Sequence, residues 1–298
     1  MNKYLKKLLP LYQKMGVNII PNRYEEPVPD LAELKNFKWD REIGLAGVDL
    51  KPKDQIKTLK KVSKYLAEFK KLPIEKILPK EVEEYFHNNP AFRATDAGIY
   101  YGLIRYFKPR RIIEIGAGFS TLLAAQAVLV NEKEGKKCDL TAIEPYPSIT
   151  LRLSVPGLKR LIEGNLQTVP LAEFEKLEKN DILFIDSSHI LRIGSDVQYE
   201  FLEILPRLKK GVLIHVHDIY FPLDYPKKLI TQDFKFYNEQ YLLQAFLAFN
   251  REFSTFWVSQ YMYRRHFELI WKHFSDFLPG GKSPESAEKN VSFWMKRQ

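Results

Sequence analysis

Short apolar runs of the kind that form strands alternate with segments of helical periodicity over most of this chain. The runs that predict strands are residues 111–115, 139–144, 158–163, 181–185, 211–217, 253–258 and 291–295. Between and after them, helices are predicted over residues 122–130, 171–177, 196–205, 238–249 and 261–274. Such alternation is typical of a parallel sheet with helices on both faces. We therefore predict an α/β, Rossmann-like fold with a doubly wound, seven-stranded and mostly parallel sheet.

The first 90 residues lack this alternation. Residues 1–16 have the spacing of a short amphipathic helix, and residues 17–52 contain several prolines without a sustained period. Further helices are predicted over residues 53–71, 80–87 and 95–106. We predict an N-terminal helical extension at residues 1–90 and a catalytic domain at residues 91–298. Both a cap over the site and a homodimer contact are consistent with such an extension.

The chain carries an excess of basic residues, with a formal net charge of +9 at pH 7. Many of its lysines lie between residues 51 and 80, where apolar residues such as Leu59, Val62 and Leu66 recur at helical spacing. This pattern predicts that the lysines form the solvated face of an amphipathic helix. The charge leaves open RNA, an anionic membrane surface or an acidic carrier as a partner.

The composition places few other restrictions on the class of protein. Hydrophobic residues make up 45% and charged residues 28%, as in ordinary globular proteins. No apolar run is long enough to span a bilayer, and the N-terminal residues lack the apolar core of a signal peptide. Cys138 is the only cysteine, which excludes an internal disulfide and a multi-cysteine zinc site. We expect a cytoplasmic protein without a membrane span.

A glycine turn follows the first predicted strand. Gly116 and Gly118 permit backbone conformations closed to other residues and a close approach of a ligand. Ser120 is the predicted N-cap of the next helix, whose unpaired N–H groups would then point over the turn. Glu144 ends the second predicted strand, where a carboxylate can accept hydrogen bonds from both ribose hydroxyls. This arrangement favours an adenosine-containing ligand.

The residues around the turn distinguish between two such ligands. Dinucleotide sites have a third glycine where this chain has Thr121, and Glu114 would place a negative charge beside a phosphate. A carboxylate there suits a cationic ligand better, such as the ammonium group of S-adenosylmethionine. Asn165, after the third strand, is a candidate for reading the adenine edge. A nicotinamide-dependent oxidoreductase remains the alternative, and Gly-x-Gly alone can be simply a tight turn.

Acidic residues and histidines follow the fourth and fifth predicted strands. Asp186 and His189 come after the fourth strand, and His217 and Asp218 after the fifth. Ligands of open α/β sheets bind beyond the carboxyl ends of the strands, so we expect these side chains to converge. They could bind Mg²⁺ or Mn²⁺ and lower the pKa of an acceptor hydroxyl, or His189 could act as a metal-free base. The alternative is that they only cap helices and satisfy backbone amides, as we expect for His215.

Several of these segments in combination resemble methyltransferase family 24. They are residues 114–121, 184–189 with 194–196, 205–206, 215–222, 224–226 and 238–247. This family comprises bacterial class I S-adenosylmethionine-dependent enzymes similar to macrocin O-methyltransferase, and the resemblance covers roughly residues 90–297. It implies a sheet closed by an antiparallel C-terminal strand. Metal-dependent relatives often have a third ligand after the second metal carboxylate, where this chain has Ile219.

The predicted site residues fall into three groups. The cofactor-binding residues are Glu114, Gly116, Gly118, Ser120, Thr121, Glu144, Asn165 and Asp186. The catalytic residues are Asp186, His189, His217 and Asp218. The metal ligands, if Mg²⁺ or Mn²⁺ is used, are Asp186 and Asp218.

The expected reaction is methyl transfer from S-adenosylmethionine to a hydroxyl of a small polar metabolite or sugar. An RNA methyltransferase that uses the lysine-rich face is one alternative, although a nucleic-acid partner is not our expectation. The nicotinamide-dependent oxidoreductase is another, as are a non-enzymatic binding protein and a different reaction like that of the related cephalosporin-hydroxylase-like proteins.

Overall fold

The computed structural model describes residues 3–19, 22–76, 84–277 and 290–298. The chain forms two compact units, residues 1–41 with 225–236, and residues 42–224 with 237–298. The smaller unit contains α1 (Lys3–Lys14), the 3₁₀ helix η1 (Glu33–Asn36) and α10 (Lys227–Thr231). Helix α1 confirms the helix predicted at the N-terminus. The larger unit contains the sheet and also residues 42–90, so a domain boundary at residue 90 stays a prediction.

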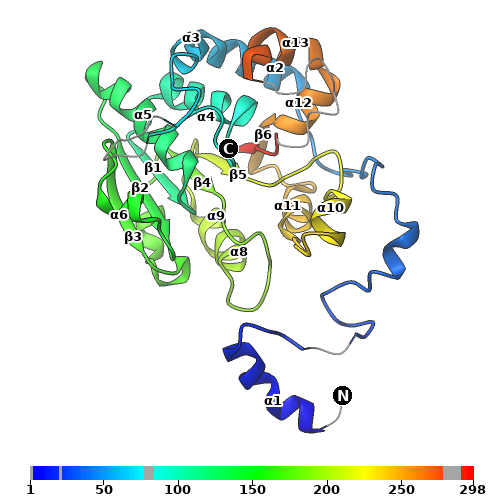
Figure 1. The fold of residues 1–298 in the computed structure, drawn as a ribbon. Helices are drawn as coiled ribbons and strands as arrows, with labels where there is room; N and C mark the ends of the chain where they lie inside the picture. The colour runs from blue at the N-terminus through cyan, green and yellow to red at the C-terminus, as the bar shows by residue number, and fades with distance from the viewer. Residues whose placement is uncertain (1–2, 20–21, 77–83, 278–289) are drawn as a thin grey trace. The chain divides into compact units, whose positions relative to one another are not determined.

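The larger unit is built on a sheet of seven strands (Figure 1). These are β1 (Arg111–Ile115), β2 (Asp139–Glu144), β3 (Leu158–Glu163), β4 (Ile182–Ile185), β5 (Leu213–Val216), β6 (Phe253–Val258) and β7 (Phe293–Arg297). Their order is β3-β2-β1-β4-β5-β7-β6. Strand β7 runs antiparallel to both of its neighbours, and the other pairs are parallel. The predicted fold, including the antiparallel C-terminal strand, is confirmed.

Helices cover both faces of this sheet. They are α2 (Pro52–Val62), α3 (Leu66–Phe69), α4 (Ala94–Phe107), α5 (Phe119–Lys133), α6 (Ile149–Leu153), α7 (Leu171–Phe174), α8 (Asp196–Tyr199), α9 (Leu205–Arg207), α11 (Glu239–Leu247), α12 (Ser259–Arg265) and α13 (Phe267–Phe274). Side chains alternate along β1, so that Ile112 belongs to the apolar cluster that includes residues of α4 and α5, while Ile113 and Ile115 belong to the cluster that includes residues of α8 and α11. The sheet thus separates two apolar cores.

The lysine-rich segment, predicted as one helix over residues 53–71, is interrupted, but its lysines face solvent as predicted. A 3₁₀ turn, η2 (Ser63–Tyr65), separates α2 from α3, and the Ser63 hydroxyl donates to the carbonyl of Lys60 at 3.1 Å. Such a side-chain bond competes with regular helical bonding. Leu59, Val62 and Leu66 are buried while the lysines of α2 are exposed, so the solvated-face interpretation is confirmed.

Other predicted helices also differ in detail. The segment predicted as one helix over 196–205 contains a π-helical stretch, Glu200–Ile204, between α8 and α9. The helix predicted over 80–87 lies partly outside the described residues, and residues 84–87 are not helical. Within the described residues, no helix is both long and apolar enough to cross a membrane.

Candidate functional site

A cavity of about 340 Å³ lies beyond the carboxyl ends of β1, β2 and β4. Its walls come from the glycine turn, from the loops that follow β2 and β3, and from the segment after β4. Four of the predicted cofactor residues line it, namely Gly116, Glu144, Asn165 and Asp186. This is where ligands of open α/β sheets are expected to bind.

The glycine turn is shaped by one obligatory glycine. Gly116 has φ +85°, and a Cβ atom there would lie 2.0 Å from the carbonyl oxygen of Asp186. No other residue fits, because both the backbone conformation and the contact exclude a side chain. Gly118 differs, since its backbone is extended and a Cβ atom would meet nothing within 4 Å. The space above Gly118 is open to a ligand.

The start of α5 corrects the predicted N-cap. The helix begins at Phe119 with Gly118 as its N-cap, and Ser120 lies buried within the first turn. Thr121 Oγ1 accepts a hydrogen bond from the Gly118 N–H at 3.2 Å. A threonine at the third helical position can reach back in this way, as in one half of a capping box. The Ser120 N-cap was therefore wrong by two positions, and Thr121 supports the turn instead.

Glu144 is held at the rim of the cavity by the main chain. Its Oε2 accepts from the N–H of Ala117 at 3.1 Å, and its Oε1 accepts from the N–H of Tyr146 at 2.9 Å. The carboxylate at the end of β2 is thus tied to the glycine turn after β1. Asn165 is exposed, lines the same cavity and precedes the short 3₁₀ helix Leu166–Thr168.

Glu114 lies behind the turn and does not line the cavity. Its carboxyl group is fully buried and accepts a hydrogen bond from the Tyr100 hydroxyl at 2.8 Å. Burial raises the pKa of Glu114 to about 7, because the charged form loses its hydration there. Any influence of Glu114 on a bound cofactor would have to pass through the turn.

The residues that follow β4 and β5 converge as predicted. His189 Nε2 lies 3.3 Å from Asp186 Oδ1 and 3.5 Å from Asp218 Oδ2. His189 has φ +60° and Asp218 has φ +53°, values that are uncommon for residues other than glycine. Backbone strain of this kind tends to gather at functional sites. The two loops therefore hold the imidazole between two carboxylates.

A residue that the sequence reasoning missed completes this cluster. Glu239, in the first turn of α11, is fully buried, and its Oε2 lies 2.9 Å from His189 Nδ1. Both ring nitrogens of His189 thus face carboxylate oxygens. The available signal was an acidic residue at a predicted helix start, which the helix dipole alone would explain. Nothing in the local sequence linked it to His189.

The charges in this cluster shift each other's protonation. Burial lowers the pKa of His189, but Asp186 and Glu239 outweigh it, and the pKa lies well above its usual range. Burial likewise raises the pKa of Asp186, but the imidazoles of His217 and His189 outweigh that effect and hold the pKa below its usual range. The geometry therefore favours an ionised Asp186 beside a protonated His189.

The two histidines of β5 and its C-terminal end have different surroundings. His215 is fully buried, stacks on Phe184 with ring centroids 3.8 Å apart and lies 2.9 Å from the Ser292 hydroxyl. This is a core position, as expected. His217 is 8% exposed and packs near Phe92, with ring centroids 5.4 Å apart. Its Nδ1 has no hydrogen-bond partner among the described residues.

The donor set does not fit a metal site. Asp186 and Asp218 supply two carboxylates, but both approach the Nε2 atom of His189. Among the described residues, no three or more His, Cys, Asp or Glu side chains are arranged to hold a metal ion. Mg²⁺ can be held by one or two carboxylates and several waters, but here both carboxylates are directed at the same imidazole nitrogen.

Comparison with known proteins identifies the domain around this cavity. Residues 113–219 match the family model of a methyltransferase domain, family 24. The chain is also 32% identical over 183 residues to an uncharacterized protein of Archaeoglobus fulgidus, covering 57% of this chain and 78% of the relative. The chain belongs to the class I S-adenosylmethionine-dependent methyltransferases. This relative is archaeal, whereas the resemblance pointed to bacterial enzymes.

Some solved structures, each with bound S-adenosylmethionine or S-adenosylhomocysteine, show a weaker likeness to this chain. The plantazolicin methyltransferase BamL, in complex with a substrate analogue and S-adenosylhomocysteine, has a TM-score of 0.41 and 13% identity, covering 82% of this chain and 96% of its own. CmcI with Mg and S-adenosylmethionine has a TM-score of 0.30 and 12% identity, covering 96% and 99%. A protein-L-isoaspartate O-methyltransferase of Plasmodium falciparum has a TM-score of 0.30 and 16% identity, covering 56% and 77%. These scores are too low to bear on the acceptor.

Proposed function

We propose that this methyltransferase transfers the methyl group of S-adenosylmethionine to a hydroxyl oxygen of a small polar metabolite or sugar. The convergence of Asp186, His189 and Asp218 beside the cavity supports the proposal most directly. Methyl transfer needs little covalent help from the protein, but a hydroxyl must be positioned and must lose its proton. A cluster of carboxylates around an imidazole can serve both needs.

The proposed division of labour places the cofactor on the side of β1 and β2. Glu144 would accept hydrogen bonds from the ribose hydroxyls, and Asn165 would contact the adenine edge. Gly118 leaves room for the cofactor to approach the backbone of the turn, and Gly116 lets that turn pack against Asp186. Asp186 lines the same cavity and would lie between the cofactor and the acceptor.

The acceptor would bind against the carboxylates. The side chains of Asp186 and Asp218 are 34% and 25% exposed, whereas His189 is 7% exposed behind them. We therefore assign the contact with the hydroxyl to Asp186 and Asp218, and assign His189 to positioning them. As the oxygen lone pair forms the new O–C bond, the S–C bond breaks and its electron pair returns to sulfur. The hydroxyl loses its proton as the O–C bond forms, and the proton leaves past the carboxylates to solvent.

Mg²⁺ or Mn²⁺ has no step in this proposal. The two carboxylates predicted as metal ligands both face an imidazole, and the described residues supply no third ligand in a suitable arrangement. In the proposed site, His189 carries the positive charge that keeps the two neighbouring carboxylates ionised together.

Calorimetric titration and product analysis test the proposal together. The protein is titrated with S-adenosylhomocysteine and, separately, with NAD⁺, and we expect saturable binding of the former alone. Incubation with a panel of hydroxylated metabolites and methyl-¹³C-labelled S-adenosylmethionine should then yield an O-methyl carbon signal. Binding of NAD⁺ alone would overturn the assignment of the cofactor. An N-methyl or C-methyl product would overturn the assignment of oxygen as the acceptor atom.

A further inference from the structure

A second buried acid, Glu200, lies in the helical segment that follows β4. It is fully buried at the start of the π-helical stretch Glu200–Ile204. Such stretches are rare and occur frequently at functional sites. The next residue, Phe201, packs edge-on against Phe246 of α11, with ring centroids 5.8 Å apart. The π-helical stretch therefore contacts the helix that carries Glu239.

The hydrogen bonds of these two acids leave one oxygen of each unsatisfied. Glu239 Oε2 lies 2.9 Å from His189 Nδ1, and Glu200 Oε2 accepts from the Ser187 hydroxyl at 3.3 Å. The other oxygen of each, Oε1, is buried and has no partner among the described residues. An ionised carboxylate can only accept, so two ionised acids would offer no donor between them. A proton on one of the two acids supplies that donor.

The surroundings of the two acids decide which one carries the proton. Burial raises the pKa of Glu200 well above its usual range, and the nearby carboxylates of Glu239 and Asp196 raise it further. Ser187 and His189 oppose this with smaller effects. Burial also raises the pKa of Glu239, but its direct contact with His189 favours the ionised form. Glu200 is therefore the acid that stays neutral.

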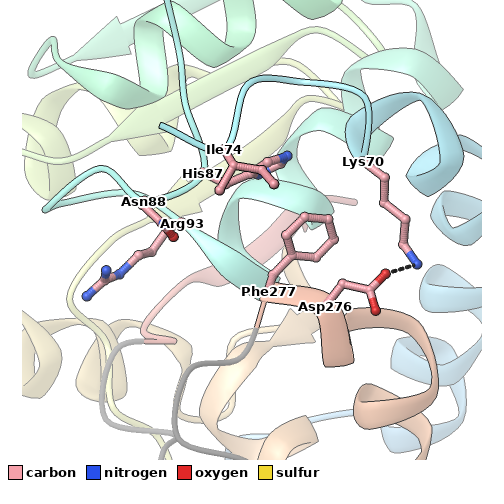
Figure 2. Close-up of a pocket in the computed structure, with 7 residues that line it drawn as sticks. All are labelled: Lys70, Ile74, His87, Asn88, Arg93, Asp276 and Phe277. Atoms are coloured by element: carbon pink, nitrogen blue, oxygen red, sulfur yellow. Dashed lines mark ion pairs between the residues drawn. The ribbon is translucent and has the colours of Figure 1, made fainter. Parts of the chain in front are cut away.

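A second buried histidine shows what burial does to an imidazole that no acid contacts. His87 and His189 are both more than nine-tenths buried. Figure 2 shows His87 beside Phe277, whereas the acid of that region, Asp276, pairs with Lys70. Burial lowers the pKa of His87, because the charged form loses its hydration there. A buried imidazole thus tends to be neutral, so the charge of His189 depends on the acids around it.

We propose that Glu200 is a positioning residue that carries a proton and thereby keeps Glu239 ionised. The ionised Glu239 holds His189 in its charged form beside the two acceptor carboxylates. A second ionised acid near Glu239 would favour protonation of Glu239 itself, because like charges repel strongly in a buried site. Glu239 would then no longer stabilise the imidazolium. This role rests on the proposed function, in which His189 positions Asp186 and Asp218.

Infrared spectroscopy tests the protonation of Glu200 without turnover. A carboxyl group that keeps its proton shows a C=O stretching band that a carboxylate lacks. Spectra are recorded at about pH 8, where Glu114, with a pKa of about 7, has largely lost its proton. We expect such a band from the wild-type protein and its loss in Glu200→Gln, because glutamine occupies nearly the same space without a carboxyl group.

Glu203→Gln is the matched control for this spectrum. Glu203 lies in the same π-helical stretch but is exposed and pairs with Arg207. Its replacement should leave the band unchanged. A wild-type spectrum without a carboxylic acid band would overturn the proposal whether or not the variants fold. A band that persists in Glu200→Gln would overturn it as well, since the proton would then belong to another acid.

The ionisation of His189 gives a second readout, which a merely structural role of Glu200 would not move. Imidazole ¹⁵N NMR signals follow its protonation, and His189→Asn assigns them. Glu200→Gln should leave the midpoint of this titration unchanged, because one neutral group replaces another. Glu239→Gln should lower it by about one pH unit or more, since a charge-assisted hydrogen bond is lost. Equal shifts in the two variants would show that Glu200 is ionised and would overturn its role.

Turnover separates this role from the proposed function. With the acceptor found by product analysis, Glu239→Gln should lose about tenfold or more in turnover, and Glu200→Gln should stay within about threefold of wild type. An equal loss in both variants would contradict the assignment of Glu200 as the neutral acid. Failure to find any O-methyl product would overturn the proposed function, whereas the infrared and NMR results would still decide the protonation of Glu200.

Discussion

The cofactor half and the acceptor half of the site are built in different ways. On the side of β1 and β2, the main chain makes the decisive contacts, with Gly116 pressed against Asp186 and Glu144 held by two backbone amides. On the side of β4 and β5, side chains meet side chains, and His189 contacts three carboxylates from three segments. Backbone geometry therefore determines the structure of the cofactor half, and the interactions among charged side chains determine that of the acceptor half.

Because of this difference, we expect mutations to separate cofactor binding from methyl transfer. The cofactor half is built mainly from backbone, so it should lose little affinity for the cofactor when a side chain of the acceptor half is removed. A charge cluster, in contrast, changes as a whole when one member is lost, because its members set each other's protonation. Variants in the two halves should therefore affect different measurements.

Asp186→Ala should give the largest effect. Turnover should fall by about 100-fold or more, because the acceptor hydroxyl loses a carboxylate that positions it and stabilises the positive charge that develops on its oxygen. The affinity for S-adenosylhomocysteine, measured by calorimetry, should fall only several-fold. Asp139→Ala is the matched control, since Asp139 is an exposed carboxylate at the opposite end of β2, paired with Lys159. A loss of binding as large as that of Glu144→Ala would contradict the separation of the two halves.

The same difference explains how much of the site could be predicted from the sequence. Gly116 and Glu144 act through neighbours close along the chain or at the adjacent strand end, so the local pattern and the fold sufficed. Asp186, His189 and Asp218 were expected to converge because the ends of parallel strands share one edge. Glu239 lies 50 residues from His189 and reaches it only through tertiary packing, so no local pattern could indicate it. The N-cap was misplaced because serine is a preferred N-cap residue, whereas here the glycine turn itself ends in the N-cap, Gly118, and Ser120 lies inside the helix.

Glu114→Gln should reveal a buried acid beneath the cofactor half. The unfolded chain loses the Glu114 proton near a pKa of 4.5, whereas the folded chain keeps it until about 7. Raising the pH between these values therefore favours unfolding in the wild-type protein. Over this window the effect is at most about 3.5 kcal/mol, at about 1.4 kcal/mol per pH unit. Glutamine can still accept from Tyr100 but does not titrate.

Urea unfolding at about pH 5 and about pH 8 measures this effect. The stability of Glu114→Gln relative to wild type should rise with pH. Glu163→Gln serves as the control, because Glu163 is an exposed residue at the end of β3, paired with Arg152. A pH-independent difference between Glu114→Gln and wild type would show that Glu114 ionises normally in the folded protein.

Glu144→Ala should affect the cofactor half alone. Its carboxylate is placed to accept two ribose hydrogen bonds, and losing a charged acceptor costs roughly 2 kcal/mol, or about 30-fold in affinity. Calorimetry with S-adenosylhomocysteine measures the loss. Turnover at saturating S-adenosylmethionine should stay within a few-fold of wild type. A large fall in turnover under saturation would place Glu144 in the acceptor half and remove the distinction between the two.

Metal removal should have the smallest effect of all. If His189 supplies the positive charge between Asp186 and Asp218, then treatment with EDTA should leave turnover within about twofold of the untreated enzyme. His189→Asn should then lose activity, and added Mg²⁺ or Mn²⁺ should not restore it. Abolition of turnover by EDTA, with recovery on adding Mg²⁺, would show instead that the carboxylates rearrange around a metal. In that case the acceptor half would depend on a bound ion, and the contrast with the backbone-built cofactor half would become sharper.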